Sequence, residues 1–304
     1  MCAWGEPAGY GILMGIITTR RMRRIIVVSA LLLLQLPLAE AATRPNSPPS
    51  LDQQVQARSA LLVDAASGRV LFSRNPTEPL PPASTLKLLT ALLVYERTHL
   101  QGNVVIEQAD TLVEPSRIPL QPGETVPVRT LVQSLLIGSD NDSALALARH
   151  TGDSVEKFVA LMNARARELG CTNSLFLNPN GLPAPGQVTT ALDLLKIFQA
   201  AMAVPELREI CRTPRLALRT AAALQTLKNH NKLLGVYPGM GPAKTGWTLR
   251  SRHTFAASAT RDGHELHLIL LHSANKWTDA RALFDFGFEQ FRRGENDSAA
   301  VAGK

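Results

Sequence analysis

Strand-like segments lie near both ends of this 304-residue chain, with a mostly helical stretch between them, and this order limits the folds it can adopt. Residues 59–75, SALLVDAASGRVLFSRN, alternate around a Ser-Gly turn and predict a β-hairpin. Residues 241–248 predict a third strand, and residues 253–273 predict two more, joined by an Asp-Gly turn. We therefore expect a mixed α/β (α+β) fold with one antiparallel five-stranded sheet built from both chain ends. Helices should flank the sheet, and the helical middle should form an inserted lobe.

The first 41 residues have the pattern of a secretory signal. Four arginines between Arg20 and Arg24 precede the apolar run Ile25–Leu38, which ends in Ala-Glu-Ala. A single membrane anchor is the alternative, but the run is short for a hydrocarbon core of roughly 30 Å. We predict a cleaved leader over 1–41, a flexible arm over the proline-rich residues 42–57, a single domain over 58–294 and a tail over 295–304. The protein would then be exported, without a stable membrane anchor.

The charge and the cysteine content limit which partners and cofactors this chain is expected to have. The net charge is +7, and removal of residues 1–41 leaves 28 positive and 23 negative side chains, or +5. This mild basicity suits contact with an anionic polymer but does not require it, and an exported chain gives no reason to expect nucleic acid. Cys171 and Cys211 could pair in an oxidising compartment, but neither has metal-ligand or C-x-x-C spacing, so we expect two separate structural thiols. His264 and His267 would point to opposite faces of a predicted strand, which argues against a zinc site. We expect neither a metal nor a cofactor.

The first candidate for chemistry is Ser84 with Lys87, at the start of an apolar helical pattern. At helical spacing the hydroxyl and the amine share one face, and a desolvated lysine has a lowered pKa that lets it activate a serine. An N-capping serine followed by a lysine that reaches solvent is the alternative. The same S-x-x-K pattern recurs at Ser154 and at Ser273, so alone it decides nothing.

Two more polar groups follow along the chain. Ser139 and Asn141 stand in a polar break between apolar helices, where they could relay a proton and bind a peptide group, or simply cap the next helix. Lys244-Thr245-Gly246 occurs once, on a predicted strand whose glycine would let another backbone approach closely. Only Ser84, Ser139 and Lys244 place S-x-x-K, S-x-N and K-T-G in that order. This is the motif set of penicillin-binding proteins and class A β-lactamases.

With these motifs, the chain resembles the low-molecular-mass penicillin-binding proteins, the serine D-alanyl-D-alanine carboxypeptidase family, from Ser59 to Phe291. Other similar segments are LNPNGL at 177–182, NHNKLLGVYPGMGPAKTGWT at 229–248 and LFDFGF at 283–288. The resemblance implies the β-lactamase/penicillin-binding transpeptidase-like fold. It also implies a periplasmic enzyme that acts on peptidoglycan stem peptides and is covalently inhibited by β-lactams.

The resemblance assigns a role to each matching residue. Ser84 would be the acylated nucleophile, Lys87 its general base and Ser139 a proton shuttle to the leaving D-alanine. Asn141 would hold the substrate's peptide group, and Lys244, Thr245 and Gly246 would dock the substrate and its terminal carboxylate. The backbone N–H groups of Ser84 and Trp247 would form the oxyanion hole.

One departure and several alternatives bear on specificity. Where the family often has a carboxylate-binding arginine, this chain has Lys276, which lacks the bidentate fork of arginine. We expect removal of the terminal D-alanine from stem pentapeptides, with D,D-endopeptidase cleavage of cross-links by the same site as the alternative. A non-catalytic wall-binding protein would be expected to lose Ser84 or Lys87 first. A β-lactamase would need an additional carboxylate, and Glu168, the candidate here, looks like the end of a helix that stops at Gly170.

Overall fold

The computed structural model describes residues 50–113 and 115–302, with side chains up to residue 293. The predicted leader and residues 42–49 of the predicted arm lie outside the described residues. All the expected strands and helices that bear on the site fall within them.

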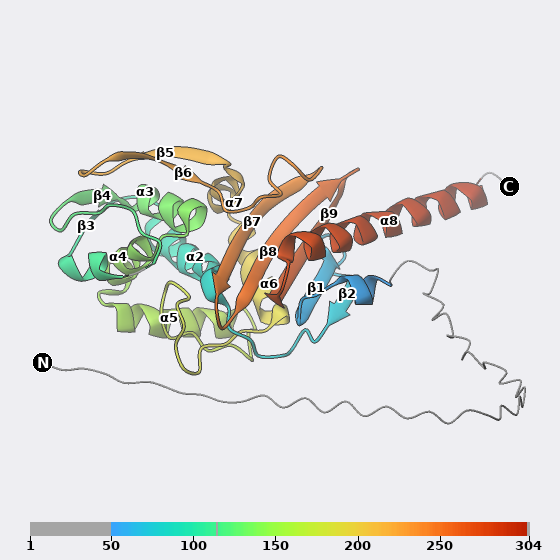
Figure 1. Cartoon of the computed structure of the whole chain (residues 1–304), viewed down its shortest axis with the longest axis horizontal. Coiled ribbons are helices and arrows are strands. Elements are labelled where there is room, and N and C mark those ends of the chain that lie inside the picture. Colours follow the sequence, from blue (N-terminus) through green and yellow to red (C-terminus); the bar gives the residue numbers. More distant parts are fainter. Residues whose placement is uncertain (1–49, 114, 303–304) are drawn as a thin grey trace, which may run out of the picture. The chain divides into compact units, whose positions relative to one another are not determined.

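One antiparallel sheet of five strands is built from both chain ends, as the strand pattern predicts (Figure 1). Its spatial order is β2-β1-β9-β8-β7. The strands are β1 Ser59–Asp64, β2 Val70–Arg74, β7 Met240–Thr248, β8 Arg252–Arg261 and β9 His264–Ser273. Strand β7, which carries Lys244, Thr245 and Gly246, is therefore an edge strand with one side free of any strand partner in this sheet.

The sheet is buried on both faces because its central strands are apolar at consecutive positions. Leu61 on β1 and Ile269 on β9 belong to the core that also contains the helical lobe. Their neighbours Leu62 and Leu268 belong to a second core, which is shared with α8 Lys276–Ala302. Adjacent residues of a strand point to opposite faces, so uninterrupted apolar runs make a three-layer arrangement of helix, sheet and helices.

The helical lobe occupies the middle of the chain, between the two sheet halves in sequence (Figure 1). Helix α2 Lys87–Thr98 runs through the first core, and eight of its residues are buried. The other elements of the described chain are α1 Leu51–Gln54, η1 Ala83–Leu86, β3 Asn103–Val105, η2 Gln108–Leu112, β4 Thr125–Pro127, α3 Val128–Gln133, η3 Ser134–Gly138, α4 Asn141–Gly152, α5 Val155–Glu168, α6 Ala191–Met202, α7 Pro205–Arg212, β5 Arg215–Arg219 and β6 Leu224–Lys228.

Two terminal segments differ from the sequence prediction. Residues 50–57, expected within a flexible arm, form the short helix α1 and pack on the domain, where Val55 and Ala57 are buried. Arg74 holds this segment by donating hydrogen bonds to the Val55 and Ala57 carbonyls, and the Gln56 N–H donates to Asp279 at 2.8 Å. Helix α8 continues to Ala302, beyond residue 294 where we expected the domain to end.

Candidate active site

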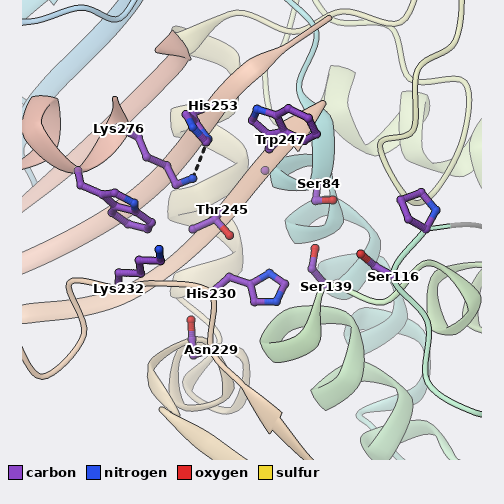
Figure 2. A pocket seen from close by; sticks show the side chains of 13 residues that line it. Ser84, Ser116, Ser139, Asn229, His230, Lys232, Thr245, Trp247, His253 and Lys276 are labelled. Carbon is purple, nitrogen blue, oxygen red and sulfur yellow. Dashed lines mark hydrogen bonds between the residues drawn. The ribbon is translucent and has the colours of Figure 1, made fainter. Parts of the chain in front are cut away.

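Ser84 lies on the short helix η1, at the wall of a cavity of about 480 Å³ between the sheet and the helical lobe (Figure 2). The Pro82 carbonyl before it accepts hydrogen bonds from Thr85 Oγ1 at 2.5 Å and from Thr254 Oγ1 at 2.9 Å. The second of these bonds ties η1 to strand β8. Ser84 is therefore held against the edge of the sheet although it is part of the helical lobe's first turn.

Lys87 is fully buried beneath Ser84, with its Nζ 3.0 Å from Ser84 Oγ. Nζ also donates to Asn141 Oδ1 and to the Asn180 carbonyl, both at 2.7 Å. Burial, and secondarily the charge of Lys244, lower the pKa of Lys87 well below its ordinary value. The two carbonyl oxygens can only accept, so a neutral amine would donate its two hydrogens to them and direct its lone pair at the Ser84 hydroxyl.

Ser139 has a left-handed backbone with φ 64°, between the π-helical turn η3 and helix α4. The turn is fixed by Asp140, whose carboxylate accepts from Ser134 Oγ at 2.6 Å. A Cβ at position 138 would lie 2.2 Å from Asp140 Oδ2, so a residue larger than glycine would displace the carboxylate that Ser134 holds. This geometry places Ser139 Oγ at the cavity wall and 2.8 Å from Lys244 Nζ, so the second and third motifs meet.

Asn141 is buried, and both ends of its side-chain amide are already bonded. Its Oδ1 accepts from Lys87, and its Nδ2 donates to the Pro115 carbonyl. Its backbone N–H donates to the Ser116 carbonyl at 2.7 Å. In this structure Asn141 orients Lys87, and contact with a substrate would require Nδ2 to exchange its bond with Pro115.

Strand β7 brings the third motif against η1. Lys244 is buried, and burial lowers its pKa to about 8. A Cβ on Gly246 would lie 2.8 Å from the Ser84 nitrogen, so only glycine allows the strand to come this close to Ser84. The Thr245 and Trp247 side chains line the cavity, and the Trp247 side chain is 54% exposed.

Lys276, the first residue of α8, lines the cavity on the side of Thr245 away from Ser84 (Figure 2). Its Nζ lies 2.9 Å from His253 Nδ1 and 4.6 Å from the centre of the Trp277 ring. Burial, together with the charge of Lys232, lowers the pKa of Lys276 to about 8. The Lys276 side chain therefore loses its positive charge as the pH rises through about 8.

Several contributors to the site were not predicted from the sequence. They are the Asn180 carbonyl, the Pro115–Ser116 segment and the side chains of His230, Lys232 and His253. His230 and Lys232 belong to a segment that the family resemblance singles out, whereas His253 carries no motif signal. None of the described residues that line the cavity is acidic.

The remaining predicted sites can be placed as well. Cys171 and Cys211 are both free and buried, which confirms the expectation of separate structural thiols. Within residues 50–113 and 115–302, no group of three or more His, Cys, Asp or Glu side chains is placed to hold a metal ion. His264 and His267 belong to β9, and the His267 ring packs edge-on against Phe198.

A serine–lysine pair at the junction of an antiparallel sheet and a helical lobe, facing K-T-G on the edge strand, defines a serine peptidase of the penicillin-binding type. The comparisons agree: the chain belongs to the D-alanyl-D-alanine carboxypeptidase family, whose model matches residues 42–275. It is 37% identical, over 76% of its length, to a D-alanyl-D-alanine carboxypeptidase of Mycobacterium tuberculosis, 82% of which is covered. It is also 29% identical to a D-alanyl-D-alanine endopeptidase of Pseudomonas aeruginosa, covering 84% of this chain and 85% of that protein.

The fold comparison points to the same class. A crystal structure of a D-alanyl-D-alanine carboxypeptidase from Mycobacterium tuberculosis superposes with a TM-score of 0.74 at 35% identity. The match covers 81% of this chain and 95% of that one. The predicted penicillin-binding fold and the predicted class of enzyme are therefore confirmed.

Proposed function

We propose that this enzyme removes the terminal D-alanine from peptidoglycan stem pentapeptides through an acyl-enzyme on Ser84. The observation that carries the proposal is the position of Lys87, whose Nζ lies 3.0 Å from Ser84 Oγ and is oriented by two carbonyl oxygens. Its hydrogen bond to the serine hydroxyl and its strongly lowered pKa support Lys87 as the base for the Ser84 proton.

In the acylation step, Ser84 Oγ attacks the carbonyl carbon of the penultimate D-alanine, and its proton passes to Lys87 Nζ. The C–N bond then breaks. The departing amine of the terminal D-alanine takes this proton from Lys87 through Ser139 Oγ, which is hydrogen-bonded to Lys244 Nζ, and Lys87 becomes neutral again. Water then attacks the ester carbon. Lys87 takes one proton from this water and passes it to Ser84 Oγ as the ester bond breaks and the shortened peptide leaves.

The edge strand β7 supplies the binding groups in this proposal. The substrate would lie along β7, with Thr245 and Lys244 near its terminal carboxylate and Gly246 allowing close backbone contact. The N–H groups of Ser84 and Trp247 would stabilise the oxyanion, and loss of one such donor typically costs on the order of a hundredfold in rate. Asn141 would hold Lys87 in place and donate Nδ2 to the substrate.

Two associated proposals concern the setting of this reaction. A β-lactam would acylate Ser84 by the same attack and would remain bound as an ester. The Arg-rich and apolar pattern of residues 1–41 supports export to the periplasm with a cleaved leader. Within the part of the chain that the structure describes, no helix is long and apolar enough to cross a membrane.

A second candidate, D,D-endopeptidase cleavage of cross-links, is supported by the similarity to the Pseudomonas aeruginosa endopeptidase over most of both chains. The chemistry at Ser84 would be the same, and only the leaving group would be larger. A third alternative is a protein that binds the cell wall without catalysis. The position of Lys87 argues against this alternative, because binding alone would not need a buried base beside Ser84.

Mass spectrometry of muropeptides after incubation with the purified enzyme tests the proposal. A pentapeptide monomer that loses one D-alanine, beside an intact cross-linked dimer, is the expected result. Splitting of the dimer into monomers would make the endopeptidase the right assignment. If neither peptide changes and a labelled penicillin still binds Ser84, the protein is a binder and the proposal is wrong.

A further inference from the structure

The hairpin of β5 and β6 has an apolar inner face and a cationic outer face. On the inner face, Leu218 and Leu227 are buried in the core of the helical lobe. Alternate residues of a strand share one face, and the exposed residues of these two strands form the outer hairpin face: Arg215, Ala217, Arg219, Leu224, Thr226 and Lys228. The outer hairpin face therefore carries three cations and no carboxylate.

The cations of the outer hairpin face are not neutralised by the rest of the described chain. Arg215 stands directly opposite Lys228 across the two strands, a position at which like charges destabilise the pairing. Among the described residues, the side chains of Arg215, Arg219 and Lys228 have no hydrogen-bond or ion-pair partner. By contrast, Arg212 at the end of α7 pairs with a glutamate at 2.7 Å. Glu124 lies at the turn of the hairpin, but both of its oxygens accept main-chain N–H groups. A bound anion would offset the repulsion on this face.

The base of the hairpin adjoins the cavity. Lys228 ends β6, and the next residue, Asn229, lines the cavity. On the inner face, Leu227 lies beside Gly138, the residue before Ser139. In Figure 1 the base of the hairpin lies near α7 and β7, and its strands run along the helical lobe. The outer hairpin face therefore begins at the rim of the site that holds the substrate in the proposed function.

The spacing of the three charges indicates the size of the ligand. Arg215 and Lys228 lie at the base of the hairpin, and Arg219 lies four residues further along β5, roughly 13 Å away. A ligand that contacts Arg219 while one of its ends occupies the cavity must therefore extend well beyond a single dipeptide. A wall polymer with many stem peptides has this length, and each of its uncleaved stem peptides ends in a carboxylate.

We propose that the outer hairpin face is a docking surface for the peptidoglycan polymer. Its cations would bind carboxylates of stem peptides that neighbour the one in the cavity. This contact would hold the enzyme on the wall between turnovers and would take no part in the chemistry at Ser84. Single surface ion pairs are weak, so the contact would be reversible and sensitive to salt. The inference rests on the proposed function for the identity of the polymer.

The experiment compares a polymeric substrate with a small one. Release of D-alanine is measured below saturation on pentapeptide-rich sacculi and on a soluble pentapeptide. Arg215→Gln/Arg219→Gln should lose roughly threefold to tenfold on sacculi at low salt, the effect of two weak ion pairs, and stay within about twofold of wild type on the soluble peptide. In about 0.5 M salt the loss should disappear, because exposed charges are then screened within a few ångströms.

The matched control removes two arginines elsewhere. Arg97 on α2 and Arg167 on α5 are exposed, and like the hairpin arginines their side chains have no partner among the described residues. Arg97→Gln/Arg167→Gln lowers the net charge by the same amount and should change the rate on neither substrate.

Two further measurements separate docking from folding. Lys228→Glu places a carboxylate opposite Arg215, so the melting temperature should stay the same or rise while retention of the protein on sedimented sacculi falls. Sacculi whose carboxylates have been converted to amides should retain the wild type no better than unmodified sacculi retain Arg215→Gln/Arg219→Gln.

The outcomes distinguish this inference from the proposed function. Equal losses on sacculi and soluble peptide, no loss on either, or retention that survives amidation of the carboxylates would overturn the docking surface. Stronger retention on anionic lipid vesicles or on nucleic acid than on sacculi would also overturn it, since the partner would then be a different macromolecule. A wild type that releases no D-alanine but sediments with sacculi through these arginines would overturn the proposed function and support the docking surface.

Discussion

The two sides of the cavity each hold a buried lysine, but the neighbours of the two lysines differ. On the first side, Lys87 has no exposed surface and donates to two carbonyl oxygens beside Ser84. On the other side, Lys276 is 7% exposed and borders His253 and Trp277, with its pKa lowered only to about 8. We infer from this difference that the surroundings, and not the residue type, suit Lys87 to act as a base and Lys276 to act as a cation for binding.

Substitution of Ser84, the proposed nucleophile, gives the largest expected effect. Ser84→Ala should reduce D-alanine release by at least about 10⁴-fold, because removing a nucleophile that acts with its base leaves only binding and oxyanion contributions. Covalent labelling by a fluorescent penicillin should disappear, while the melting temperature should stay within a few degrees of wild type. Labelling that persists in this variant would mean that another residue is acylated.

The same substitution at the two lysines sharpens the comparison. Lys87→Met should lower kcat by about 10³-fold, within the range for loss of a general base. Lys276→Met should instead raise KM about tenfold and leave kcat nearly unchanged, since it removes a binding charge. Steady-state kinetics on one pentapeptide measures both, and a fall in kcat of similar size in both variants would break the distinction.

Substitutions at two glycines test how η1, which carries Ser84, is held in place. A Cβ on Gly181 would lie 2.1 Å from the Ala83 carbonyl oxygen and 3.0 Å from the Ser84 nitrogen. Gly181→Ala should therefore displace η1 and slow penicillin acylation about tenfold or more. Gly263 has nearly the same φ, +80° against +83°, but no atom within 4 Å of a Cβ. Gly263→Ala should cost about 1 kcal/mol of stability and leave the acylation rate unchanged.

The smallest expected effect is the pH dependence of the activity, which concerns the lysines proposed to bind the substrate's carboxylate. Lys244 and Lys276 both have pKa values lowered to about 8, so each loses its positive charge as the pH rises through that value. For a substrate with a free carboxylate, kcat/KM should fall above about pH 8. For the amide-terminated peptide it should not fall there, because no carboxylate is bound. An equal alkaline fall for both would assign these lysines to proton transfer.

The sequence predicts the five-stranded sheet and the junction of Ser84, Ser139 and Lys244 because these depend on period-2 patterns and on motif order. It does not predict the Asn180 carbonyl or the Pro115–Ser116 segment, since main-chain contacts from loops leave no residue-type signal. His253 meets Lys276 only through the packing of α8 beside β8, which no local pattern encodes. Asn141 is predicted as a site residue, but its bond to Lys87 emerges only from the folded lobe.

The most direct test of the account is to trap the covalent intermediate and locate it. The enzyme is quenched during turnover of a pentapeptide, digested and mapped by tandem mass spectrometry. The account predicts a shortened stem peptide esterified to Ser84, absent in Ser84→Ala and strongly reduced in Lys87→Met. An acyl group on any other residue, or D-alanine release without an acyl-enzyme under conditions that trap one with penicillin, would contradict it.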